Sequence, residues 1–154
     1  MRRITILVGL VLFLAAPSRA EFSATVTRIV DGDTFHVLRD GKDVTIQVHG
    51  IDAPELKQEF GTQAKKMLTD RLMGKTVRLV EKETDRFGRL VAQVYLDSTD
   101  VSAEMVRGGG AWAYVHFSKD YVAQEQEARK AKRGLWAAEN PKAPWTWRKE
   151  NARN

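Results

Sequence analysis

Five short stretches in which apolar and polar residues alternate constrain the fold of this chain more than any other feature. Alternation with a period of two is typical of β-strands that bury one face. The stretches cover residues 24–27, 35–37, 44–49, 77–79 and 90–94. The turn-forming pair Asp40-Gly41 separates the second from the third, and the residues 85–88 separate the fourth from the fifth. Each of these pairs is therefore expected to form a hairpin.

Apolar residues at helical spacing occupy three further segments, 62–73, 101–107 and 121–133, and a glycine follows each of them closely. Glycine at this place is typical of a helix end. Five short strands together with about three helices predict an α+β domain, built as a small closed β-barrel with helices packed around it.

The first twenty residues have the pattern of an export signal: two arginines, an apolar run over 4–16 and small residues before a cleavage site after Ala20. The apolar run is too short to cross a bilayer, which needs about 20 residues. We therefore expect an exported protein, periplasmic or extracellular, without membrane association once processed. Three arginines leave with the signal, so the formal charge falls to 5 − 3 = +2. That balance alone barely distinguishes nucleic-acid binders from other proteins.

The remaining residues are expected to form one domain over 21–139 and a tail over 140–154. Because the tail contains two prolines, it is expected to be extended, with Trp145 and Trp147 docked on the barrel surface. The chain has no cysteine, which excludes disulfides, thiol catalysis and zinc–thiolate sites. A monomer is the default expectation.

Two groups of acidic residues lie where predicted strands begin or end. Asp31 and Asp33 precede the second strand, and Asp52 and Glu55 follow the third. Neighbouring strands bring both groups to one rim of the barrel. Carboxylates gathered there repel each other and lose hydration, so their presence indicates a bound cation or a chemical task. A hard divalent ion suits such oxygen ligands, and a carboxylate outside its coordination shell can activate water. Taken alone, each group is more typical of an ordinary turn.

The order of motifs along the chain is more specific than any one of them. The motifs are VDGDT at 30–34, GIDAPE at 50–55, TDRFGR at 84–89 and GLW at 134–136. In this order and spacing the chain resembles the staphylococcal nuclease (thermonuclease) family over about 22–147. The resemblance implies a five-stranded OB-fold barrel with three helices, a bound calcium ion and hydrolysis of phosphodiester bonds in DNA and RNA.

Carried over position by position, the resemblance assigns Asp33 and Asp52 as calcium carboxylates and the carbonyl of Ala53 as a further ligand. Glu55 falls on the general base that orients the attacking water. Arg89 falls on the arginine that neutralises charge on the transition-state phosphorus and its leaving oxygen, an electrostatic role that usually dominates such catalysis.

One position departs from the family pattern. Gln47 stands on the third strand where the family usually has a second arginine, and its amide offers neither charge nor a two-pronged grip on phosphate. Losing one such donor costs on the order of 100-fold in rate, so the enzyme is expected to be slow unless another cation substitutes. The candidates are His49, Arg78 and Lys57. Gln47→Arg is expected to raise the rate of hydrolysis.

Tyr114 and His116 fall where the family has aromatic residues near the bound nucleotide. Stacking on bases by such residues suits single strands without sequence preference. The sequence thus predicts a secreted, calcium-dependent endonuclease acting on DNA, RNA or both. The alternative is an OB module that binds nucleic acid and has little or no catalytic activity. Gln47 supports this alternative, whereas Glu55 opposes it, because a binder needs no group that activates water.

Overall fold

A computed structural model describes residues 20–152 of the chain. The predicted export signal over 1–20 lies outside the described residues, apart from Ala20. Within the described part of the chain, none of the helices combines the length and the apolar character that a membrane span requires.

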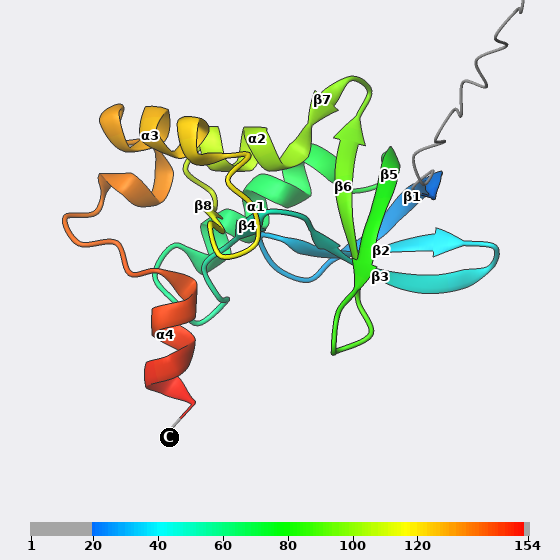
Figure 1. Cartoon of the computed structure of the whole chain (residues 1–154), viewed down its shortest axis with the longest axis horizontal. Coiled ribbons are helices and arrows are strands. Elements are labelled where there is room, and N and C mark those ends of the chain that lie inside the picture. Colours follow the sequence, from blue (N-terminus) through cyan, green and yellow to red (C-terminus); the bar gives the residue numbers. More distant parts are fainter. Residues whose placement is uncertain (1–19, 153–154) are drawn as a thin grey trace, which may run out of the picture.

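The main sheet has six strands, five of which close into a barrel (Figure 1). The strands are β1 (Glu21–Ile29), β2 (Thr34–Arg39), β3 (Lys42–Val48), β5 (Thr76–Thr84), β6 (Leu90–Leu96) and the short β7 (Thr99–Asp100). Their order is β3-β2-β1-β5-β6-β7, with antiparallel neighbours throughout. A parallel pairing of β3 with β6 closes the barrel and sets Gln47 opposite Val91. The predicted five-stranded OB-fold barrel is confirmed.

The helices pack around the barrel and two further short strands pair beside it. The helices are α1 (Gly61–Leu72), α2 (Val101–Arg107), α3 (Val122–Lys130), the 3-10 helix η1 (Gly134–Ala137) and α4 (Pro144–Asn151). Helices α1, α2 and α3 occupy the three segments predicted to be helical, with ends that differ by at most three residues. The short strands β4 (Ile51–Asp52) and β8 (Trp112–Ala113) pair antiparallel.

The core fills the barrel and extends beneath α1 and α2. Alternate strand positions point inward as their apolar pattern predicts, and Phe35, Ile46 and Leu79 are fully buried. Helix α1 adds Leu68 and Leu72, four residues apart and therefore on one face. Each such side chain stabilises the fold by about 1.5–3 kcal/mol through burial. This packed body is the scaffold that holds the ends of β2, β3 and β5.

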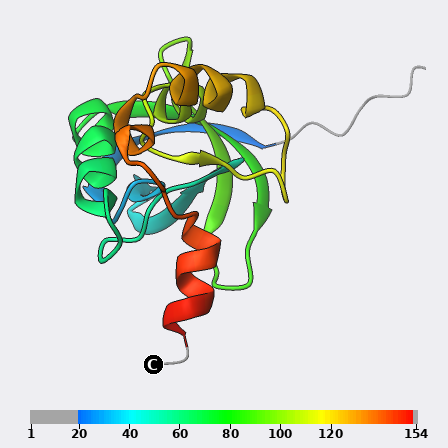
Figure 2. The same cartoon turned by 90° about the vertical axis from the view of Figure 1, so that its left-hand side faces the viewer.

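The tail is not extended as predicted, because its second half forms α4. Pro144 occupies the first turn of this helix, where a missing N–H leaves no hydrogen bond unmade, and the run from Arg148 to Glu150 has good helix propensity. Trp145 does pack against the domain: its ring lies edge-on to Trp112 on β8, beside the barrel, at 5.4 Å between centroids. Both views show α4 extending from the same side of the barrel as the β5–β6 turn (Figures 1 and 2).

Candidate active site

Seven of the eight residues that the sequence predicts for the site line one pocket of about 810 Å³. The pocket lies where β2 begins and β3 ends, and residues of the β5–β6 turn form part of its wall. The seven are Asp33, Gln47, Asp52, Ala53, Glu55, Arg89 and Tyr114. Residues far apart in the sequence therefore converge here as expected, while their chemical roles stay predictions.

Asp33 joins the two acidic groups. Its Oδ2 accepts a hydrogen bond of 2.7 Å from the backbone N–H of Ala53. The turn can approach this closely because Gly32 lacks a side chain: a Cβ there would lie 2.7 Å from the Cβ of Ala53 and 2.8 Å from that of Ala64. Burial, followed by repulsion from Asp31 and Asp52, holds the pKa of Asp33 well above its usual value. The ionised carboxylate is therefore costly here without a compensating cation.

Asp52 is the second buried carboxylate and is only 6% exposed. It lies on β4, opposite Trp112 on β8, so this small sheet fixes its position. Burial raises the pKa of Asp52, and hydrogen bonds and charge from Arg148 only partly offset that effect. Asp33 and Asp52 thus share an environment that favours a neighbouring positive charge.

Arg148 supplies such a charge and is a site residue that was not predicted from the sequence. Its Nη2 donates to Asp52 Oδ2 at 2.7 Å and its Nη1 to Asp52 Oδ1 at 3.0 Å. The same Nη1 also donates to Glu55 Oε1 at 2.8 Å. The side chain comes from α4, which the sequence had assigned to an extended tail. A usable signal was present: Arg148 follows Trp145 by three residues, so docking of that tryptophan turns the arginine to the same side of a helix.

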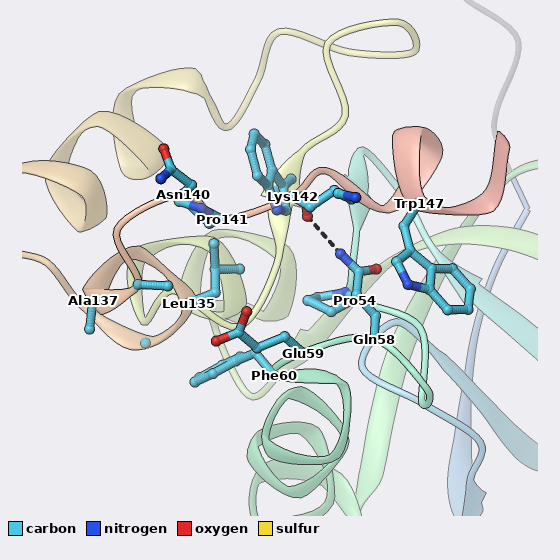
Figure 3. A pocket seen from close by; sticks show the side chains of 13 residues that line it. Pro54, Gln58, Glu59, Phe60, Leu135, Ala137, Asn140, Pro141, Lys142 and Trp147 are labelled. Atoms are coloured by element: carbon cyan, nitrogen blue, oxygen red, sulfur yellow. Dashed lines mark hydrogen bonds between the residues drawn. The ribbon is translucent and has the colours of Figure 1, made fainter. Parts of the chain in front are cut away.

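Gln58 ties the loop that carries Glu55 to the segment that leads into α4. Its amide is 8% exposed, accepts from the N–H of Glu55 at 3.2 Å and donates to the carbonyl of Lys142 at 2.6 Å. Figure 3 shows this second bond, and both Gln58 and Trp147 line the neighbouring pocket of about 570 Å³ that it draws. One buried side chain therefore couples the position of Glu55 to that of the tail.

Arg89 is held at the edge of the pocket by its own turn. Its Nε donates to Asp85 Oδ2 at 2.7 Å, and its backbone N–H donates to Oδ1 at 3.0 Å. Desolvation opposes ionisation of Asp85, but the hydrogen bonds from Arg89 and from the N–H of Phe87 outweigh it and lower the pKa of Asp85. The TDRFGR motif thus forms a preorganised turn that orients a guanidinium.

Gln47 faces the pocket, and only some of its expected substitutes lie nearby. The Thr34 hydroxyl donates to Gln47 Oε1 at 2.9 Å or to Asp33 Oδ1 at 3.0 Å. His49 lines the pocket. Arg78 was a wrong candidate, because it pairs with Glu21 at 3.4 Å and lies over the ring of Tyr95. It stands near the start of β5, whereas only the end of that strand lines the pocket. Lys57 is exposed and lies outside the pocket lining.

The two predicted nucleotide-stacking residues lie differently. Tyr114 lines the pocket. His116 does not, and packs edge-on against Tyr114 at 5.6 Å and Trp145 at 5.8 Å between ring centroids. Its exposed ring therefore lies next to a residue of the pocket, and a contact of His116 with substrate stays a prediction.

The donor chemistry of the pocket fits a hard divalent cation, although no group of three or more His, Asp or Glu side chains poised to hold a metal occurs within 20–152. Six carboxylates and three guanidinium groups line the pocket, so anions are in excess. The carboxylates belong to Asp31, Asp33, Asp52, Glu55, Glu83 and Asp85, and the guanidinium groups to Arg86, Arg89 and Arg148. Oxygen ligands with unbalanced negative charge are what such a cation prefers.

Comparison with known proteins agrees with this geometry. A family model described as "Staphylococcal nuclease homologue" matches residues 45–138, more than half of the chain. The chain belongs to the staphylococcal nuclease family. It is 38% identical to micrococcal nuclease from Shigella flexneri, over 95% of this chain and 92% of that protein. It is 42% identical to an uncharacterized endonuclease from Escherichia coli O157:H7, over 84% of this chain and 86% of that protein. The predicted family and the predicted enzyme class, a phosphodiester hydrolase, are thereby confirmed.

Proposed function

We propose that this protein is an exported, calcium-dependent nuclease that hydrolyses phosphodiester bonds of DNA, RNA or both. The observation that carries the proposal is the convergence of Asp33, Asp52, Glu55 and Arg89 in one pocket of a nuclease-family barrel. Asp33 and Asp52 would hold the cation, with the carbonyl of Ala53 as a further oxygen donor. A bound divalent cation would supply positive charge that polarises a phosphate oxygen.

The residues of the chain divide the remaining chemistry among them. Glu55 takes a proton from a water molecule, whose oxygen forms the new bond to phosphorus. The bond between phosphorus and the leaving oxygen breaks, and its electron pair stays on that oxygen, which then takes a proton from solvent. Arg89 neutralises the charge that develops on the phosphoryl group and the leaving oxygen. Glu55 returns its proton to solvent, so that the phosphoryl product carries the oxygen of the water and the other product carries a new hydroxyl proton.

The substrate side of the pocket suits an unpaired strand. Tyr114 lies in the pocket with Phe117, and their rings stack at 5.4 Å between centroids with an angle of 23°. Flat aromatic groups bind bases through their faces, which are accessible when the strand is single. We therefore propose single-stranded nucleic acid as the favoured substrate. Separately, we propose that the protein acts as a monomer.

Digestion of single-stranded DNA by the purified protein tests the proposal. Cleavage is expected with calcium and is expected to disappear with a chelator. Glu55→Gln is expected to slow cleavage by at least about 100-fold, because the amide cannot take the proton from water. Glu59→Gln, which removes an exposed carboxylate nearby, is the matched control and should cleave like the wild type.

Two results would contradict the proposal. Binding of the DNA without cleavage in calcium would favour the alternative, a nucleic-acid-binding module, for which Gln47 is the supporting observation. Cleavage that ignores both the chelator and Glu55→Gln would place the activity outside this site.

A further inference from the structure

The active-site pocket receives a guanidinium from a part of the chain beyond the family match. The matched residues end at 138, whereas Arg148 lies on α4, which begins at Pro144. Within the pocket, Gln47 is neutral at the position where the family pattern expects an arginine. Arg148 is one of three guanidinium groups set against six carboxylates. Without Arg148 only two guanidinium groups would remain in the pocket lining. Its positive charge therefore reduces the repulsion that an anionic phosphodiester meets there.

Arg148 contacts the two carboxylates between which the proposed mechanism would place the phosphate. Its N–H groups lie 2.7–3.0 Å from Asp52 and 2.8 Å from Glu55. A phosphate that shared a cation with Asp52, and was attacked by a water bound to Glu55, would lie next to both carboxylates. A guanidinium that already contacts both would then be within hydrogen-bonding reach of the phosphate oxygens.

The attachment of α4 makes this placement specific. Ala143 and Pro144 are buried at the start of the helix. Trp145 packs against Trp112 and against Tyr114, at 5.4 Å and 5.6 Å between ring centroids. These contacts fix the end of the helix that lies nearest the pocket. Arg148 itself stays 43% exposed, so its side chain has room to change partner.

We propose that Arg148 is a catalytic residue of this enzyme and performs the phosphate-binding role that Gln47 cannot. The inference rests on the proposed nuclease function. In the described structure Arg148 forms ion pairs with Asp52 and Glu55. With a cation bound at Asp52, Arg148 turns its N–H groups to the phosphate and stabilises the charge that builds up on its oxygens.

The test compares Arg148→Gln with Lys149→Gln, which removes the same charge from the neighbouring, exposed position of the same helix. We expect kcat on single-stranded DNA to fall by about 100-fold for Arg148→Gln and by less than about twofold for Lys149→Gln. Arg148→Lys should retain part of the rate, because a lysine keeps the charge but loses the fork of donors. Adding Gln47→Arg to Arg148→Gln should restore at least about tenfold, since it returns a guanidinium to the pocket.

Two measurements besides activity separate this role from other roles. Calcium affinity, measured by calorimetry, should be unchanged or tighter in Arg148→Gln, and its Tm should stay within about 3 °C of the wild type. A rate that rises together with tighter calcium binding would overturn the proposal. It would mean that Arg148 competes with the cation for the carboxylates and inhibits the enzyme. A rate that falls only in proportion to a lower Tm would make its role structural. If the wild type itself does not cut, the proposed function fails instead.

Discussion

Gly32→Ala tests whether the close contact between the two acidic groups builds the active site. The added Cβ would meet the Cβ atoms of Ala53 and Ala64 at 2.7 Å and 2.8 Å. Carbon atoms prefer about 3.5–4.0 Å, so the turn must move by close to 1 Å. Overpacking of this kind costs about 1–3 kcal/mol, which lowers Tm by roughly 3–10 °C for a domain of this size.

The same movement affects catalysis more than stability. Asp33 would no longer reach the N–H of Ala53, now 2.7 Å away, and would leave its place beside Asp52. Because a displacement of about 1 Å can cost roughly 100-fold in rate, we expect kcat to fall by that factor at a temperature where the variant is folded. Steady-state cleavage of single-stranded DNA and thermal denaturation measure the two effects.

Gly41→Ala is the matched control for this variant. Gly41 has a φ of +74° with no atom near its missing Cβ, so alanine there costs about 1–2 kcal/mol through the backbone alone. It lies in the β2–β3 hairpin, away from the pocket, and its kcat should stay within about twofold. A Gly32→Ala protein with the Tm and kcat of the wild type would refute the packing argument.

Two further substitutions probe the pocket charge and the tail. Asp33→Asn should raise Tm in chelator at neutral pH, because the raised pKa of Asp33 means that the folded state loses stability as pH rises above the usual value of 3.8. The gain should vanish at lower pH, and calcium should no longer raise Tm; a Tm below that of the wild type at pH 7 would contradict this reasoning. Trp145→Ala should lower kcat by about tenfold with a Tm loss under about 5 °C, because it removes the ring contacts that hold the helix of Arg148 in place. An unchanged kcat would show that these contacts are not needed for catalysis.

The sequence predicted most of the barrel because its strands and turns are local signals. Phe35 and Ile46 alternate with polar neighbours, and both are buried as that alternation requires. The acidic site was also predictable, since Asp33 and Asp52 flank strands that must be adjacent. The number of strands predicted that the barrel closes, but no local pattern shows that β3 pairs with β6, because these strands are far apart in the sequence.

The tail shows where sequence reasoning failed. Its prolines suggested an extended chain, but Pro144 stands where a helix accepts proline. The partners of Arg148 lie more than ninety positions away, at Asp52 and Glu55, and no spacing rule links such residues. The ring contact between His116 and Trp145 was not predictable for the same reason, because the two residues are far apart in the sequence.

The closure of the barrel has a consequence for how the enzyme loses its activity. Three residue pairs join β3 to β6, whereas six join β2 to β3. This short seam connects segments more than forty positions apart and contains Gln47, at the wall of the pocket. Proteins open first where few bonds resist separation. Separation of β3 from β6 would disrupt the active site while the hairpins remain folded. Heat or denaturant should therefore inactivate the enzyme before most of the barrel unfolds.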